Sequence, residues 1–194
     1  MQSFVSAFVL AGGKSTRMGS DKAFLVLDGE TLLHHAVQAV SAVTHQVMIV
    51  GPKSKFSSYA PVVEDIFPER GPLGGIHAAL MSTATALNLV LAVDLPFIEP
   101  AFLSYICNRA RETQALVVIP RAAGGWQPLC AVYRKEFGTV AEKALAAGRN
   151  KIDSLFADVS VAAIDEQEIT HAGFSVDMFR NLNTQQELKE ANGG

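Results

Sequence analysis

A short apolar segment that runs directly into a pair of glycines constrains the fold of this chain most. Residues 4–10 form a β-favouring run, and Gly12 and Gly13 end it abruptly. Glycine has no Cβ atom, so a ligand can approach the backbone amides of such a turn closely. The pattern predicts a first buried strand that is followed by a ligand-binding turn.

Three cations follow the glycine pair within reach of it: Lys14, Arg17 and Lys22. Positive charge beside exposed backbone amides indicates a nucleotide triphosphate as the ligand. A Walker loop is excluded because Phe8 stands where that motif needs its first glycine, and a dinucleotide fingerprint is excluded because the turn has no Gly-x-Gly step. An ordinary glycine-rich turn with solvated lysines stays open for Lys14.

Nearly continuous apolar runs recur along the chain and predict strands that are buried on both faces of a sheet. These runs cover residues 4–10, 46–50, 87–93, 115–119 and 129–133. Helical patterns lie between them, at 32–40, at 74–81 and from Pro100 onward, and a capping box of Thr184 and Glu187 opens a last helix. The alternation predicts an α/β fold of three layers, in which a largely parallel, twisted sheet carries helices on both faces.

Composition fits a single domain. The chain has 194 residues, of which 49% are hydrophobic and 18% charged, so one domain over 1–194 can bury one sizeable core. The net charge of −3 gives no reason to expect nucleic acid or an anionic membrane as a partner. Cys107 and Cys130 lack metal-type spacing and are expected to be core thiols in a reducing cytosol.

The apolar start of the chain superficially resembles a signal peptide. No Lys or Arg precedes Lys14, however, and the apolar run ends in the glycine turn itself. No apolar stretch approaches the length that a membrane-spanning helix needs. We therefore expect a cytoplasmic protein.

Two carboxylates follow predicted strands, at the edge where open parallel sheets bind ligands. Asp94 comes after the strand at 87–93, where a carboxylate can hold Mg²⁺ against phosphate oxygens or can simply cap a turn. Asp65 precedes a second glycine turn, at 70–75, whose backbone amides are candidates for binding a base edge or a ribose. Close packing of a helix is the alternative explanation for Gly75.

Two further loops carry candidate binding groups. Loop 121–127 contains Trp126, which either stacks on a flat heterocycle or closes over the core. Arg149 and Lys151 follow a predicted helix, where they can dock a second phosphate or complement the helix dipole. His34 and His35 are adjacent but have no ligand at metal-type spacing, and the other three histidines are isolated, so the histidines predict neither a metal site nor a catalytic triad.

The segment LAGGKSTRMGSDK, at residues 10–22, resembles the signature of molybdenum cofactor guanylyltransferases. Further segments of that family follow in order: ED at 64–65, GPLGG at 71–75, VDLPF at 93–97, QPL at 127–129 and NLNT at 181–184. The resemblance covers essentially the whole chain, although many nucleotidyltransferases share the first motif. It implies a Rossmann-like nucleotidyltransferase fold and an enzyme that transfers GMP from GTP to the terminal phosphate of molybdopterin.

The resemblance also implies roles for single residues. Catalysis is assigned to Arg17, Lys22 and Asp94, with Asp94 as the ligand of the cofactor Mg²⁺. The residues implied in GTP binding are Leu10, Ala11, Gly12, Gly13, Lys22, Asp65, Gly74 and Asp94. The residues implied in acceptor binding are Gln127, Arg149, Asn181 and Asn183. Molybdenum-insertion and molybdoenzyme-maturation proteins are expected partners, and a monomer is favoured over an obligate oligomer.

Two turns bear on nucleotide selectivity. Relatives that use CTP usually resemble LAAG in the first turn, so Gly12 and Gly13 favour guanine. Some relatives carry a nucleotide-contacting Asn just after the second strand, whereas this chain has Val50, Gly51 and Pro52 there.

Two other functions remain open from the sequence. One is a cytidylyl or sugar-1-phosphate nucleotidyltransferase of the same fold. The other is a nucleotide-binding regulator that has lost turnover, and the presence of both Lys22 and Asp94 argues against it.

Overall fold

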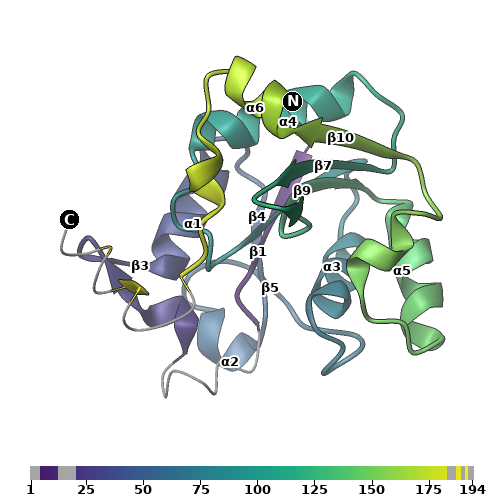
Figure 1. Cartoon of the computed structure of the whole chain (residues 1–194). Helices are drawn as coiled ribbons and strands as arrows, with labels where there is room; N and C mark the ends of the chain where they lie inside the picture. Colours follow the sequence, from purple (N-terminus) through teal and green to yellow (C-terminus); the bar gives the residue numbers. More distant parts are fainter. Residues whose placement is uncertain (1–4, 13–20, 183–186, 189–190, 192–194) are drawn as a thin grey trace.

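The protein is built around one mixed sheet with helices packed on both faces (Figure 1). This computed structural model describes residues 5–12, 21–182, 187, 188 and 191. Within them, an eight-stranded sheet has the order β10-β7-β9-β6-β1-β4-β5, and β8 pairs with β7. Its strands are β1 (Val5–Leu10), β4 (Val47–Val50), β5 (Val62–Val63), β6 (Leu87–Ala92), β7 (Val117–Ala122), β8 (Gly125–Trp126), β9 (Cys130–Arg134) and β10 (Val161–Asp165). A small second sheet pairs β2 (Val26–Leu27) with β3 (Glu30–Thr31).

Three of the longer helices begin where the sequence supplies a cap or a proline. Thr31 caps the first long helix by accepting a hydrogen bond from the His34 amide at 3.1 Å, and Pro72 and Pro100 open two others. The α-helices are α1 (Leu32–Ser41), α2 (Lys53–Phe56), α3 (Pro72–Ser82), α4 (Pro100–Arg111), α5 (Phe137–Ala146) and α6 (Glu166–His171). Short 3-10 helices are η2 (Lys22–Phe24), η3 (Ile152–Leu155) and η4 (Val176–Phe179).

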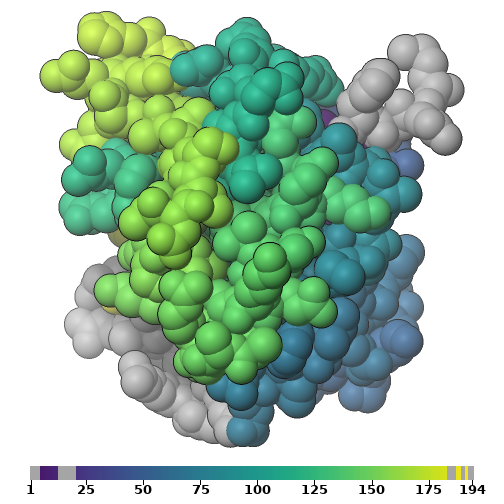
Figure 2. Space-filling model, turned by 90° about the vertical axis from the view of Figure 1, so that its right-hand side faces the viewer, coloured from purple at the N-terminus to yellow at the C-terminus, as the bar shows by residue number. Residues whose placement is uncertain are grey.

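Alternate residues of the fully buried strand β1 face two separate parts of the core. Ala7 and Val9 pack with α1 and α4, whereas Phe8 and Leu10 pack with α3 and α5. Figure 2 shows the second face, on which blue α3 lies beside green α5. Burial on both faces explains why this strand reads as a continuous apolar run, and the three predicted layers are confirmed.

Strand direction determines where a site can form. β1 pairs in parallel with β4 and β6, β4 with β5, and β7 with β10, so their carboxyl ends share one edge. β9 runs antiparallel to both of its neighbours, β6 and β7. The prediction of a largely parallel sheet is therefore correct, and β9 is the exception within its centre.

Three further expectations from the sequence concern the cysteines, membrane-spanning helices and the last helix. The buried, unpaired thiols of Cys107 and Cys130 confirm the prediction of core cysteines, and burial raises the pKa of both. No helix in the described part of the chain is long and apolar enough to cross a membrane. Thr184, the predicted cap of the last helix, lies outside the described residues, while Glu187 and Leu188 are helical.

His77 on α3 is a buried histidine for which sequence analysis found no role. Only 1% of its surface is exposed, and neither ring nitrogen has a hydrogen-bond partner among the described residues. The ring of Phe67 contacts it edge to face, with centroids 5.2 Å apart. Burial lowers the pKa of His77, and the negative charge of Glu142 on α5 opposes that shift more weakly.

We expect His77 to make folding sensitive to mild acid. Its folded-state pKa lies below the ordinary value of 6.5, so the unfolded chain binds the proton more readily. The stability that neutral His77 contributes is therefore full above about pH 6.5 and is lost as the pH falls below it. Each pKa unit of lowering corresponds to about 1.4 kcal/mol.

The measurement is urea unfolding at about pH 7.5 and about pH 5, in wild type and His77→Leu. The wild type should lose more free energy of unfolding between the two conditions than His77→Leu does. His45→Gln removes an exposed histidine and should behave as the wild type. Equal acid sensitivity in wild type and His77→Leu would contradict the assignment.

Candidate active site

The start of the glycine turn is locked between two strands at the carboxyl edge of the sheet. The amides of Ala11 and Gly12 both donate to the Val50 carbonyl, at 3.0 and 3.1 Å, and the Val93 amide donates to the Leu10 carbonyl at 3.2 Å. Gly12 is exposed, and a Cβ atom there would make only ordinary contacts, 3.5 Å or more from its nearest neighbours. The protein's own packing therefore does not require glycine at this position. Gly13, Lys14 and Arg17, which were predicted to continue the site, lie outside the described residues.

Lys22 is held by the short helix that follows the turn. Asp21 caps η2 by accepting a hydrogen bond from the Ala23 amide at 3.2 Å, and Ala23 is fully buried. The other oxygen of Asp21 pairs with Lys55 of α2 at 2.6 Å. These contacts fix the backbone from which the Lys22 side chain extends.

Lys22 and Asp94 meet across the carboxyl edge of the sheet. The Nζ atom of Lys22 donates to Oδ2 of Asp94 at 2.9 Å, and the two side chains are 15% and 25% exposed. Asp94 follows β6, the strand beside β1, so neighbouring strands bring together residues from distant parts of the sequence. The structure thus joins two of the three predicted catalytic residues in one ion pair.

The second carboxylate oxygen of Asp94 has a different environment. Oδ1 is buried and has no hydrogen-bond partner among the described residues. Within that part of the chain, no backbone amide donates to the Asp94 carboxylate, which disfavours the alternative role as a turn cap. A buried hydrogen-bond acceptor without a donor lowers the stability of the fold. A cation that prefers oxygen ligands would supply the missing partner.

No group of three or more acidic, histidine or cysteine side chains in the described residues could enclose a metal ion. A cation held by Asp94 would therefore have at most one other such side chain from the described residues as a ligand. That arrangement suits Mg²⁺, which is usually bound by one or two carboxylates together with water and substrate phosphates.

The chain's last described loop closes against Asp94. The Leu182 amide donates to the Asp94 carbonyl at 3.1 Å, and Asn181 beside it is exposed. The structure therefore brings the segment of Asn181, a predicted acceptor residue, to the backbone of Asp94. Asn183 lies outside the described residues.

The loop after β5 carries Asp65 near the first turn. The Gly51 amide donates to the Val63 carbonyl at 2.9 Å, which ties the start of this loop to the end of β4. Asp65 is on the surface, yet partial burial raises the pKa of its carboxyl group. A Cβ atom at Gly51 would lie 2.8 Å from the Phe56 ring, so a side chain such as Asn does not fit there.

Packing accounts for much of the second glycine turn. A Cβ atom at Gly74 would lie 3.0 Å from the Phe67 carbonyl oxygen, and one at Gly75 would touch Leu10 and Val50 at 3.4 Å. The tight approach of the loop that carries Phe67 is thus sufficient to explain Gly74, whereas Gly75 lies close to the sheet without a contact that requires glycine. GTP binding by Gly74 stays a prediction.

The loop with the single tryptophan forms the β7–β8 hairpin. The Gln127 side-chain amide donates to the Ala122 carbonyl at 2.8 Å and so closes the hairpin. Trp126 packs edge to face on Phe156, with centroids 5.5 Å apart. This contact favours the interpretation in which the indole covers the core.

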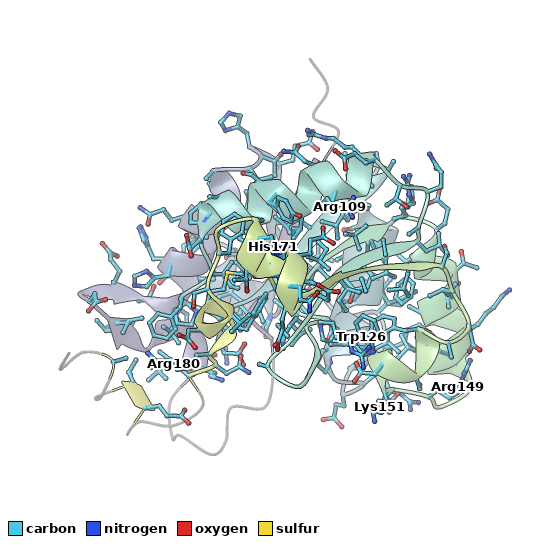
Figure 3. All side chains as sticks on the ribbon, turned by 45° about the horizontal axis from the view of Figure 1, so that its top comes forward. Arg109, Trp126, Arg149, Lys151, His171 and Arg180 are labelled. Atoms are coloured by element: carbon cyan, nitrogen blue, oxygen red, sulfur yellow. The ribbon has the colours of Figure 1, made fainter. Side chains whose placement is uncertain are left out.

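Arg149 lies at the end of α5, away from Asn181. Its amide donates to the Ala144 carbonyl at 2.8 Å, and its guanidinium pairs with Asp158 at 3.4 Å on the surface. Figure 3 shows Arg149 and Lys151 together on one side, whereas Arg180, the neighbour of Asn181, lies on the other. The structure therefore does not bring Arg149 and Asn181 together, and a helix-end role explains Arg149 by itself.

Sequence analysis missed two contacts at this edge. One is the Asp21–Lys55 pair, and the other is Arg180, whose guanidinium carbon lies 4.4 Å from the centre of the Phe97 ring. The one sequence feature that could have identified Arg180 is its position next to Asn181. Its contact with Phe97 depends on a fold that brings residues 180–182 to the loop after β6.

Comparisons with known proteins agree with this geometry. Residues 7–183 match the MobA-like NTP transferase domain. A molybdenum cofactor guanylyltransferase of Desulfosudis oleivorans is 35% identical over 96% of this chain and 94% of its own. The solved molybdopterin-guanine dinucleotide biosynthesis protein A of Archaeoglobus fulgidus is 26% identical, with a TM-score of 0.85 over 97% of both chains.

A solved 4-diphosphocytidyl-2C-methyl-D-erythritol synthase of Anaerococcus prevotii is more distant. It is 17% identical, with a TM-score of 0.71 over 98% of this chain and 95% of its own, which is a likeness of fold alone. The domain match and the guanylyltransferase relative, in contrast, each span nearly the whole sequence. The chain belongs to the MobA-like NTP transferase family.

Proposed function

We propose that the protein transfers GMP from GTP to the terminal phosphate of molybdopterin and releases pyrophosphate. The observation that carries the proposal is the Lys22–Asp94 pair beside the glycine turn at the carboxyl edge of the sheet. The names of the relatives, molybdenum cofactor guanylyltransferase and molybdopterin-guanine dinucleotide biosynthesis protein A, supply the two substrates.

The proposed reaction is a direct displacement at phosphorus. An oxygen of the acceptor phosphate attacks the α-phosphorus of GTP, and the bond from that phosphorus to the bridging oxygen of the β-phosphate breaks. Catalysis of this kind rests on aligning two anions and offsetting their charge. Lys22 suits this role because its ammonium group is held at the edge where the triphosphate would lie, and we assign Arg17 the same role.

Mg²⁺ is the proposed cofactor. Nucleotidyltransferases of this kind usually use a divalent metal ion. The buried Oδ1 atom of Asp94, which has no hydrogen-bond partner among the described residues, fits a hard cation. When bound, the ion would supply positive charge to the phosphate oxygens. Asp94 would hold it, while Lys22 keeps the other carboxylate oxygen in place.

The nucleotide assignment rests on the two loops beside β4. Gly12 is exposed and has room around it, so its missing side chain suits a ligand that approaches the amides. We assign Asp65 to GTP as well, because a carboxylate accepts hydrogen bonds from the ring and exocyclic N–H groups of guanine. We also assign GTP binding to Leu10, Ala11 and Gly13.

Thermal unfolding with GTP, CTP, ATP or UTP, each with Mg²⁺, tests the nucleotide. A ligand at about 100 times its Kd stabilises the native state by about 2.7 kcal/mol, so GTP should raise the unfolding midpoint by roughly 5–10 °C. The other nucleotides should have much smaller effects at equal concentration.

Preference for CTP would instead support the cytidylyl alternative. Release of pyrophosphate that depends on both GTP and molybdopterin then tests the reaction itself. If the protein binds GTP but releases no pyrophosphate when the acceptor is present, the enzymatic proposal is wrong. The protein would then be a nucleotide-binding protein without turnover.

A further inference from the structure

The segment from Phe179 to Leu182 is fixed beside Asp94 at three points. The buried ring of Phe179 packs edge to face on Phe102, with centroids 5.5 Å apart. Leu182 is buried with Leu27 and Leu32, and its amide donates to the Asp94 carbonyl at 3.1 Å. The backbone that carries the exposed residues between them is therefore held in place.

Arg180 lies on this fixed segment with its head group stacked on an aromatic ring. Its guanidinium carbon is 4.4 Å from the centre of the Phe97 ring, and Phe97 itself packs against the cluster around Leu182. Within the described residues, no carboxylate or carbonyl oxygen forms an ion pair or hydrogen bond with the Arg180 side chain. Arg109, Arg134 and Arg149, in contrast, all have such partners. Arg180 can thus offer its N–H edge to a ligand while its face rests on Phe97.

The chemistry of this position indicates a phosphate. Guanidinium groups bind phosphate oxygens through two parallel hydrogen bonds, and stacking on a ring limits the freedom that binding would otherwise remove. A surface stack of this kind contributes little to stability by itself, so it orients the group more than it stabilises the fold.

Arg180 could bind a phosphate of GTP or the phosphate of the acceptor, and the contacts of Asp94 distinguish the two. The Asp94 side chain points to Lys22, which is assigned to the triphosphate, whereas the Asp94 carbonyl binds Leu182. Arg180 therefore belongs to a different segment from the nucleotide turn, one that is bound to Asp94 through Leu182 and that also carries Asn181. We propose that Arg180, oriented by Phe97, binds the terminal phosphate of the acceptor and sets the enzyme's affinity for it.

This inference rests on the proposed function, and steady-state kinetics test it. The rate of GMP transfer is measured against molybdopterin at saturating GTP, and against GTP at saturating molybdopterin. Arg180→Gln should raise the KM for molybdopterin roughly 10-fold or more and leave the KM for GTP near the wild-type value. Phe97→Leu keeps the charge but removes the stack, so it should raise the same KM by a smaller factor.

Arg111→Gln is the matched control. Arg111 is exposed at the far end of α4 and donates to Asn108 at 3.0 Å, so its loss should change neither KM. Thermal unfolding of each variant checks that the fold is retained. An unchanged molybdopterin KM in Arg180→Gln would overturn the inference, and so would a rise confined to the KM for GTP, because the bound phosphate would then belong to the nucleotide.

Direct titration of molybdopterin, followed by pterin fluorescence, separates this inference from the proposed reaction. If the wild type binds molybdopterin without transferring GMP, the proposed reaction is wrong, and weaker binding by Arg180→Gln still supports the role of Arg180. Equal binding by the two proteins, or no binding by the wild type, would overturn that role.

Discussion

Replacing Asp94 by Asn is expected to reduce metal-dependent GMP transfer by about 100-fold or more while the protein stays folded. Asparagine has nearly the same shape, and its side-chain oxygen can still accept the Lys22 hydrogen bond that Oδ2 now accepts at 2.9 Å. The change removes the negative charge and replaces the other oxygen with an NH₂ group. An NH₂ group cannot bind Mg²⁺, so the loss should appear as a failure of the metal to support turnover.

The measurement is pyrophosphate release as a function of Mg²⁺ concentration, with GTP and molybdopterin both saturating. Glu112→Gln makes the same carboxylate-to-amide change in an ion pair with Arg109 at the far end of α4, and it should retain wild-type activity. Asp94→Asn should unfold near the wild-type midpoint. Full activity of a folded Asp94→Asn protein would refute the metal-binding role of Asp94.

The layers of the fold follow from local pattern. β1 and β6 are apolar at nearly every position because both faces of the sheet are covered, and such runs are visible without knowledge of the fold. Pro100 and Pro72 open helices where a fixed φ angle is favourable. The direction of β9 was not predictable in this way, since a buried strand has the same pattern whether it runs parallel or antiparallel to its neighbours.

The candidate site was predictable in its positions but not in its contacts. Lys22 and Asp94 are 72 residues apart: Lys22 was identified as a cation that follows the glycine turn, and Asp94 because it follows an apolar strand. Their ion pair depends on the pairing of β1 with β6, which no local pattern specifies. Arg149 shows the opposite case. Its positive charge in the sequence suggests a phosphate-binding residue, but the fold places it at a helix end beside Asp158.

Removing the Lys22 side chain is expected to slow GMP transfer by about 100-fold or more, because the ammonium group would offset charge that builds on the leaving pyrophosphate. Lys22→Ala also leaves the Asp94 carboxylate, which is only 25% exposed, without the cation that now lies 2.9 Å away. Some loss of stability should accompany the loss of activity. Lys143→Ala, which removes an exposed lysine from α5, should alter neither property.

Combining Lys22→Ala with Asp94→Asn separates the structural role of the pair from its catalytic role. The double variant has no unpaired carboxylate at this position, so it should regain much of the stability that Lys22→Ala loses. Activity should stay as low as in the worse single variant, and the two losses should not multiply, because both residues act on the same phosphate charge. If the double variant instead recovered activity together with stability, Lys22 would serve only to neutralise Asp94 and would have no direct role in transfer.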